Sequence, residues 1–170
     1  RGGKSAWATA AKFMVFIGVI STFGNLIRSN DGPAFAELAK IAAGLDPISK
    51  INVKVAPDGR SLMLKGNLGE GSALEVKRIL DAASGAQVIQ IRSSGGRVHE
   101  ARAIANEVKA RRLNTYVDEN CESACTMVFL AGRDRGATPN AKIGFHRASI
   151  AGEDISDGPG SDLLIATYRA

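Results

Sequence analysis

Aromatic residues are scarce in this chain, since Phe, Trp and Tyr together make up 5% of its 170 residues, whereas glycine occurs 19 times. An interior with so few rings must be filled mainly by Ala, Val, Ile and Leu, with backbones that approach one another closely. Apolar residues account for 45% of the chain and charged residues for 23%, which is ordinary globular composition and excludes a disordered protein. We expect one α/β domain with an appendage.

Cysteine and histidine are also rare, with two of each in the chain. So few cysteines exclude a disulfide-dense miniprotein. The cysteines are four residues apart with no His pair nearby, which makes a poor zinc site. We therefore predict neither a metal nor a cofactor.

Long runs of basic charge are absent as well. The net charge of +5 comes from 22 basic and 17 acidic residues, and the basic ones are scattered. No RNA-binding aromatic strand, zinc-finger spacing or basic zipper accompanies them. We expect a solvated surface rather than a nucleic-acid partner.

The one long apolar stretch is AWATAAKFMVFIGVISTFGNLI, residues 6–27, which is close to the ~20 residues that a membrane helix needs. Arg1 and Lys4 precede it, which predicts a cytoplasmic N-terminus with the rest of the chain outside. No small-residue cleavage site clearly follows, so residues 1–28 are expected to form an uncleaved signal anchor that contacts the membrane through residues 6–27. The alternative is a buried or amphipathic helix of the globular domain. Because the chain begins with Arg1, we also expect it to be a fragment.

Residues 29–50 have the breakers of a linker, with a short helix over 34–43. Residues 51–170 are expected to form the main domain. Apolar residues alternate over 51–55 and 62–64 around a turn at 57–59, which predicts a β-hairpin. A helix is expected to begin at Ser72, which would cap it, and to end at Gly85. The further expected elements are a strand over 88–91, a helix over 98–108, a strand at 116–117, a helix over 124–131 and a strand over 142–145 that leads to His146. Alternating strands and helices favour a mainly parallel sheet, with function at the strand ends.

Three features could carry chemistry. Gly95 and Gly96 follow a strand and precede a helix, where two backbone N–H groups could hold an oxyanion; a plain tight turn is the alternative. Ser123 lies in Cys121-Glu122-Ser123-Ala124-Cys125, where a strand meets a helix. His146 ends a strand and could act as a base at neutral pH, although such a histidine can also be purely structural.

Cys121 and Cys125 leave two interpretations open. In an oxidising compartment they could form a local disulfide that fixes the turn around Ser123. In a reducing compartment they would be free thiols, and Cys125 would compete with Ser123 as the nucleophile.

Together these stretches resemble the ClpP/crotonase superfamily, and more closely the ClpP-like periplasmic serine proteases of bacteria. The resemblance covers roughly residues 51–147. The residues that carry it are Ser93-Ser94-Gly95-Gly96-Arg97-Val98, Cys121-Glu122-Ser123-Ala124-Cys125-Thr126, Ala131-Gly132, Arg135, Pro139 and Gly144-Phe145-His146. Their order and approximate spacing match the family's glycine loop, nucleophile turn and histidine strand.

The resemblance implies a ClpP/crotonase-like spiral of β-α-β units and a serine peptidase. Ser123 would be the nucleophile and His146 the general base, with N–H groups of Gly95 or Gly96 and of Ala124 forming the oxyanion hole. It further implies a peptide or protein substrate, a possible homo-oligomer, and a place in the bacterial inner membrane with the domain facing the periplasm. No cofactor is implied.

Two departures from the family pattern leave alternatives open. The family's nucleophile position falls nearest Ala124, between Ser123 and Cys125, and the acidic third member of the triad would lie beyond Ala170. Lys142 is a second candidate base, ranked below His146. The rival functions are a non-catalytic module that binds a peptide or acyl group, and crotonase-like acyl-CoA chemistry, which export of the domain would disfavour.

Overall fold

The computed structural model describes residues 12–18, 20–21, 24, 32–146, 149–150, 153–154, 162 and 165–166. The expected anchor at residues 6–27 therefore falls largely outside the described residues, and the part that is described is helical. Within the described part of the chain, no helix combines the length and the apolar character needed to cross a bilayer.

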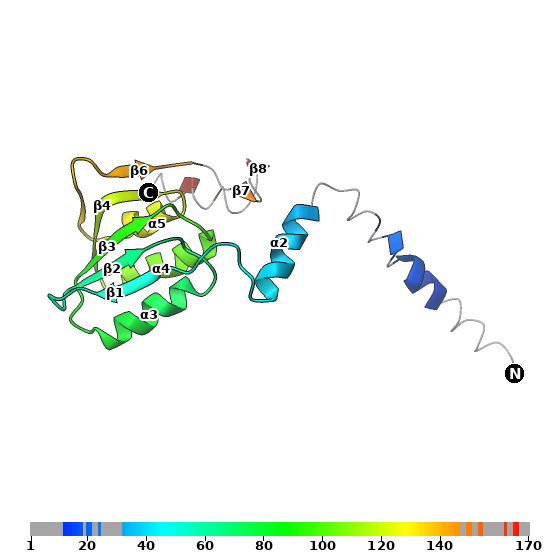
Figure 1. Ribbon diagram of the computed structural model, residues 1–170, viewed down its shortest axis with the longest axis horizontal. Coiled ribbons are helices and arrows are strands. Elements are labelled where there is room, and N and C mark those ends of the chain that lie inside the picture. The colour runs from blue at the N-terminus through cyan, green and yellow to red at the C-terminus, as the bar shows by residue number, and fades with distance from the viewer. Residues whose placement is uncertain are drawn as a thin grey trace, which may run out of the picture.

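The described elements alternate between strands and helices over most of the chain (Figure 1). The helices are α2 (Gly32–Ala42), α3 (Ser72–Ala82), α4 (Val98–Ala110) and α5 (Cys125–Leu130). The strands of the main sheet are β1 (Asn52–Val55), β2 (Ser61–Lys65), β3 (Val88–Ser93), β4 (Asn114–Glu122), β5 (Arg135–Ala137) and β6 (Lys142–Gly144), and β7 (Ser149–Ile150) pairs with β8 (Glu153–Asp154).

The main sheet has the order β1-β2-β3-β4-β5, with β6 also paired to β4. Strands β1 and β2 form the expected antiparallel hairpin, and every other pairing in this sheet is parallel. The long strand β4 pairs with β5 through residues 115–117 and with β6 through residues 120–122. The prediction of a mainly parallel α/β sheet is confirmed.

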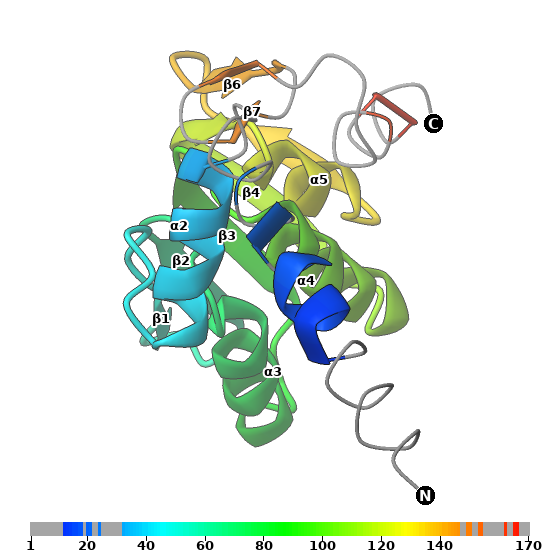
Figure 2. The same cartoon turned by 90° about the vertical axis from the view of Figure 1, so that its right-hand side faces the viewer.

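Helices α3, α4 and α5 cover one face of this sheet, as both views show (Figures 1 and 2). Side chains on alternate strand positions point into the core, as the burial of Ile89 and Ile91 in β3 illustrates. The fully buried aliphatic side chains include Leu62, Leu64, Val76, Leu80, Ile104, Val108 and Val117. Each contributes about 1.5–3 kcal/mol of hydrophobic stabilisation. This core fixes the parallel strands so that the turns after β3 and β4 emerge at the same end of the sheet.

Three sequence-based details differ from the structure. Ser72 does not cap α3; it is the helix's first residue, and its buried hydroxyl donates to the Gly69 carbonyl at 2.6 Å. The carboxylate of Glu100 takes over the capping role, because it accepts the N–H groups of Gly71 at 2.9 Å and Ala73 at 2.6 Å. Strand β5 was not predicted, and β6 ends at Gly144, two residues before His146.

Candidate active site

The turn between β3 and α4 contains the two glycines singled out from the sequence. Gly95 has φ 100° and Gly96 has φ 139°, conformations that residues with a Cβ rarely adopt. A Cβ on Gly96 would lie 2.6 Å from the carbonyl oxygen of Leu68. The backbone of Leu68 clasps this turn, because its N–H donates to Gly95 O and its carbonyl accepts from Arg97 N–H, both at 2.8 Å.

The turn between β4 and α5 contains Ser123, which has φ 54° although it is not glycine. Such a conformation costs of order 1–3 kcal/mol and persists only where the surroundings enforce it. Here the Ser123 N–H donates to Gly144 O at 2.8 Å. The Ser123 carbonyl accepts both the N–H of Thr126, at 3.0 Å, and its hydroxyl, at 2.6 Å. The turn thus holds a serine in a strained backbone at the end of β4.

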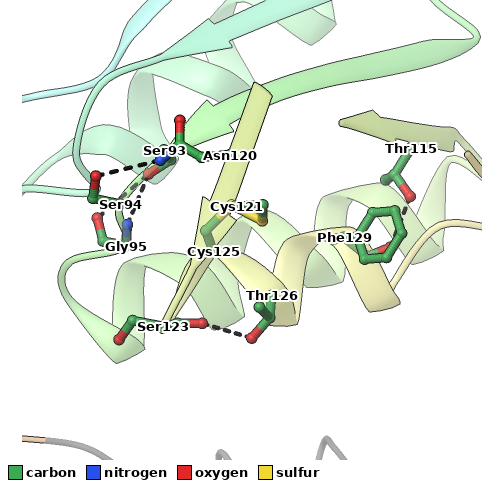
Figure 3. Close-up of a disulfide and its surroundings, with 10 residues drawn as sticks. All are labelled: Ser93, Ser94, Gly95, Thr115, Asn120, Cys121, Ser123, Cys125, Thr126 and Phe129. Atoms are coloured by element: carbon green, nitrogen blue, oxygen red, sulfur yellow. Dashed lines mark hydrogen bonds between the residues drawn. A yellow bond between two sulfur atoms is a disulfide. The ribbon is translucent and has the colours of Figure 1, made fainter. Parts of the chain in front are cut away.

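The two turns are in direct contact (Figure 3). A Cβ on Gly95 would lie 2.7 Å from the Cβ of Ser123 and 2.7 Å from the carbonyl oxygen of Glu122. Glycine at position 95 is therefore required for the Ser123 turn to pack this closely. The structure brings together two of the three features that the sequence singled out.

The histidine segment adjoins the same turn through its backbone. Strand β6 pairs with β4 in a register that puts Gly144 opposite Glu122, next to the bond between Ser123 N–H and Gly144 O. His146 follows two residues later and is exposed. Its segment is thus next to Ser123, while the pairing of its imidazole with the Ser123 hydroxyl stays a prediction. Lys142 is exposed at the opposite end of β6 from the Ser123 turn.

The backbone N–H groups around Ser123 differ in their availability. The Gly95 N–H donates to the hydroxyl of Ser93 at 3.1 Å. Among the residues that the structure describes, the N–H groups of Gly96 and Ala124 have no acceptor. Backbone donors without an acceptor, in the two turns that meet at Ser123, are groups of the kind that can stabilise an oxyanion. Of the two glycines proposed from the sequence, Gly96 has the unengaged donor, and Gly95 supplies the close approach.

A disulfide joins Cys121 at the end of β4 to Cys125 at the start of α5 (Figure 3). Both residues are fully buried, and their Cα atoms are 5.4 Å apart. The bridge spans the turn that carries Ser123. The disulfide considered from the sequence is present, and in this state Cys125 has no thiol to act as a nucleophile.

A metal ligand set was not expected, yet Glu70, His99 and Glu100 place one ligand atom each within 4.8 Å of one another. His99 Nε2 lies 3.0 Å from a Glu70 oxygen. Both oxygens of Glu100 already accept N–H groups at the start of α3. Helix capping and a surface pair account for these contacts.

Sequence reasoning missed the residues that hold the glycine turn in place. Ser93 is buried and orients Gly95, and the Asn120 side chain donates to the Ser94 hydroxyl at 3.4 Å. A Ser-x-Gly pattern at a strand end is a usable signal for the first of these contacts. The Asn120 contact depends on the register between β3 and β4 and has no local signal.

The topology and the two strand-end turns define an α/β domain with a mainly parallel sheet and two turns in contact at one end of it. Neither a protein-family model nor a curated protein matches the sequence. Among solved structures, ClpP1 from Listeria monocytogenes gives a TM-score of 0.51 at 23% identity, covering 64% of this chain and 65% of that one. The resemblance to ClpP is therefore confirmed at the level of the fold.

Two further solved structures are similar to the chain. A point mutant of the same ClpP1 gives a TM-score of 0.47 at 22% identity, covering 65% of this chain and 66% of that one. A mutant of the 1510-N membrane-bound stomatin-specific protease gives 0.49 at 20% identity, covering 63% and 58%. The chain thus spans slightly less than two thirds of the ClpP1 chains that it matches.

Proposed function

We propose that this domain is a serine peptidase of the ClpP-like type, with Ser123 as its nucleophile. The observation that carries the proposal is the contact between the two turns. Ser123, held at a positive φ, packs against Gly95 so closely that a Cβ at position 95 would collide with it. In the same two turns, the N–H groups of Gly96 and Ala124 have no acceptor among the described residues. Acyl transfer needs a presented nucleophile and nearby backbone donors for the oxyanion, and this arrangement supplies candidates for both.

In the proposed reaction, the Ser123 hydroxyl attacks a peptide carbonyl while His146 accepts its proton. The carbonyl oxygen becomes an oxyanion that is held by the N–H of Ala124 and by that of Gly96, or of Gly95 if the Ser93 hydroxyl releases it. His146 returns the proton to the leaving amine, and a water molecule then hydrolyses the acyl-enzyme by the same route.

The proposed location is the outer side of a bacterial inner membrane, with the domain in the periplasm. The Cys121–Cys125 disulfide supports it, because such bridges persist in oxidising compartments. Residues 6–27 would serve as the anchor. Self-association into a homo-oligomer is part of the same proposal, since it follows from the likeness to ClpP.

Labelling with a fluorophosphonate probe tests the proposed nucleophile. The probe forms a bond between phosphorus and the Ser123 oxygen and releases fluoride, while the serine proton goes to the base. We expect labelling of the wild-type chain, loss of labelling in Ser123→Ala, and a strong reduction in His146→Gln. Ser94→Ala is the matched control, because Ser94 is an exposed serine close to the turn.

A second control separates the serine from the cysteines. Labelling should persist, although more slowly, in the Cys121→Ala/Cys125→Ala double variant. A wild-type chain that is not labelled, yet binds peptides saturably, would favour the non-catalytic binding module.

A further inference from the structure

Arg97 immediately follows the double glycine and precedes α4, and its side chain reaches away from the helix. Its Nη1 lies 2.6 Å from an oxygen of Glu37 in α2, and its Nη2 lies 2.7 Å from an oxygen of Asp46 in the segment after α2. The exposed fractions of these three side chains are 15%, 19% and 11%. The guanidinium therefore connects the glycine turn to a segment some fifty residues earlier in the sequence, which was expected to be only a linker.

Asp46 extends this connection to a third segment. One of its oxygens accepts the N–H of Ile48 at 3.0 Å, and the other accepts that of Glu70 at 2.8 Å. The Arg97 hydrogen bond is the main reason that the pKa of Asp46 falls to about 2, so the carboxylate stays charged at all ordinary pH values. The loop that contains Glu70 also contains Leu68, whose backbone clasps Gly95 and Arg97.

The packing of these segments is close enough to transmit a displacement. A Cβ on Gly69 would collide with the Ile48 carbonyl oxygen, so the chain after Asp46 lies directly on the loop of residues 68–70. That loop lies on the glycine turn, and the turn lies on Ser123. The chain after Asp46, the loop of residues 68–70, the glycine turn and the Ser123 turn thus pack against one another in that order. The Arg97 guanidinium links the glycine turn directly to Asp46. In Figure 1, α2 lies beside the same end of the sheet.

We propose that Arg97 is a positioning residue: by pairing with Glu37 and Asp46, it holds the double-glycine turn at the distance from Ser123 that oxyanion binding requires. The inference rests on the proposed peptidase function and deepens it. The Nε of Arg97 is buried without an acceptor among the described residues, so the two carboxylates are the fixed points of its side chain. Residues 32–50 are then part of the catalytic framework and not a spacer.

Arg111 offers a matched control. It follows the other end of α4 and also pairs with two carboxylates, those of Asp81 and Glu107. It lies at the opposite end of the helix from the glycine turn. Both Arg97→Gln and Arg111→Gln should therefore lower the stability of the fold by removing ion pairs, but only Arg97→Gln should displace the glycine turn.

The experiment measures fluorophosphonate labelling of the full chain, resolved into probe affinity and maximal rate. We expect Arg97→Gln to lower the maximal rate about tenfold or more with little change in affinity, because small misplacements of oxyanion donors are costly. Arg97→Lys should recover part of the rate, since it keeps the charge with one contact. Glu37→Gln and Asp46→Asn should lower the rate less, with Asp46→Asn the stronger of the two. Arg111→Gln should leave the maximal rate unchanged.

Hydrogen exchange at the Leu68 amide, which donates to Gly95 O, reports on the turn without any catalysis. We expect faster exchange there in Arg97→Gln than in wild type or Arg111→Gln. Equal labelling rates and equal Leu68 exchange in the Arg97 and Arg111 variants would overturn the inference. If no chain is labelled, the peptidase proposal fails by itself, and Leu68 exchange alone decides whether Arg97 positions the turn. Should Arg97→Gln not fold, Glu37→Gln and Asp46→Asn provide the same comparison.

Discussion

The turns after β3 and β4 lie against each other, yet they reach their left-handed conformations by different means. The β3 turn uses two residues without side chains, so Gly95 and Gly96 adopt positive φ at no steric cost. The β4 turn puts a serine in that region and holds it there with three hydrogen bonds and a disulfide. A turn that only presents backbone N–H groups can be glycine, whereas a turn that presents a hydroxyl must stabilise a strained residue.

This comparison predicts its largest effect for a methyl group added to the β3 turn. Gly96→Ala and Gly95→Ala each combine a positive φ with backbone or Cβ atoms at 2.6–2.7 Å, and should each lower the free energy of unfolding by about 3 kcal/mol or more. Urea denaturation measures the loss. Gly85→Ala is the control, because the nearest atom to its Cβ would be 3.7 Å away. Similar, small losses in all three variants would mean that the turn is not sterically constrained.

The second effect concerns the covalent clamp of the β4 turn. The Cys121→Ala/Cys125→Ala variant should unfold about 2 kcal/mol more easily, the value expected for a closed loop of five residues. It should also be labelled more slowly, because the Ser123 turn loses one of its restraints. Urea denaturation and labelling with and without dithiothreitol check this. The wild type should respond to the reductant and the double variant should not; a wild type that ignores the reductant would show that the bridge restrains nothing.

The difference between the turns also explains what could be predicted from the sequence. Gly95 and Gly96 are a local signal, since a glycine pair between an apolar strand and a helix announces the turn by itself. Alternating apolar residues around a turn likewise indicated the hairpin, and the alternation of strands and helices indicated the parallel sheet, because both patterns can be read over short stretches of the chain.

Contacts across the fold had no such local signal. Nothing near Glu37 or Asp46 in the sequence indicates that they meet Arg97, which lies more than fifty residues further on. Glu100 capping α3 and the contact of Asn120 with Ser94 depend on how separate elements pack. The positive φ of Ser123 was also unpredictable, because serine does not favour it and only the surrounding bonds impose it.

A third prediction uses that strain directly. Ser123→Gly should make the protein about 1 kcal/mol more stable than Ser123→Ala, since glycine adopts a φ of 54° without a Cβ penalty. Both variants should lose fluorophosphonate labelling. Urea denaturation of the pair isolates the backbone cost that the β4 turn carries in order to present a hydroxyl. A glycine variant no more stable than the alanine variant would mean that the turn stores no strain.

The smallest expected effect is a loss of stability at acid pH that reaches the β3 turn before the β4 turn. The pKa of Asp46 is about 2 in the folded state and 3.8 in its reference state, so its carboxylate binds protons more weakly when folded. Its contribution to stability is therefore complete above pH 4 and is lost as the pH falls from about 4 to 2, by on the order of 1 kcal/mol after allowance for solvent screening. Because Asp46 holds Arg97, acid should loosen the β3 turn first.

The β4 turn is held by backbone groups, a threonine hydroxyl and a disulfide, none of which titrates in this range. Hydrogen exchange corrected for its intrinsic pH dependence should show protection falling at Leu68 before Ser123, and Asp46→Asn should abolish that order. Simultaneous loss of protection at both amides in the wild type would show that the two turns open as one unit and that Asp46 does not act on the β3 turn separately.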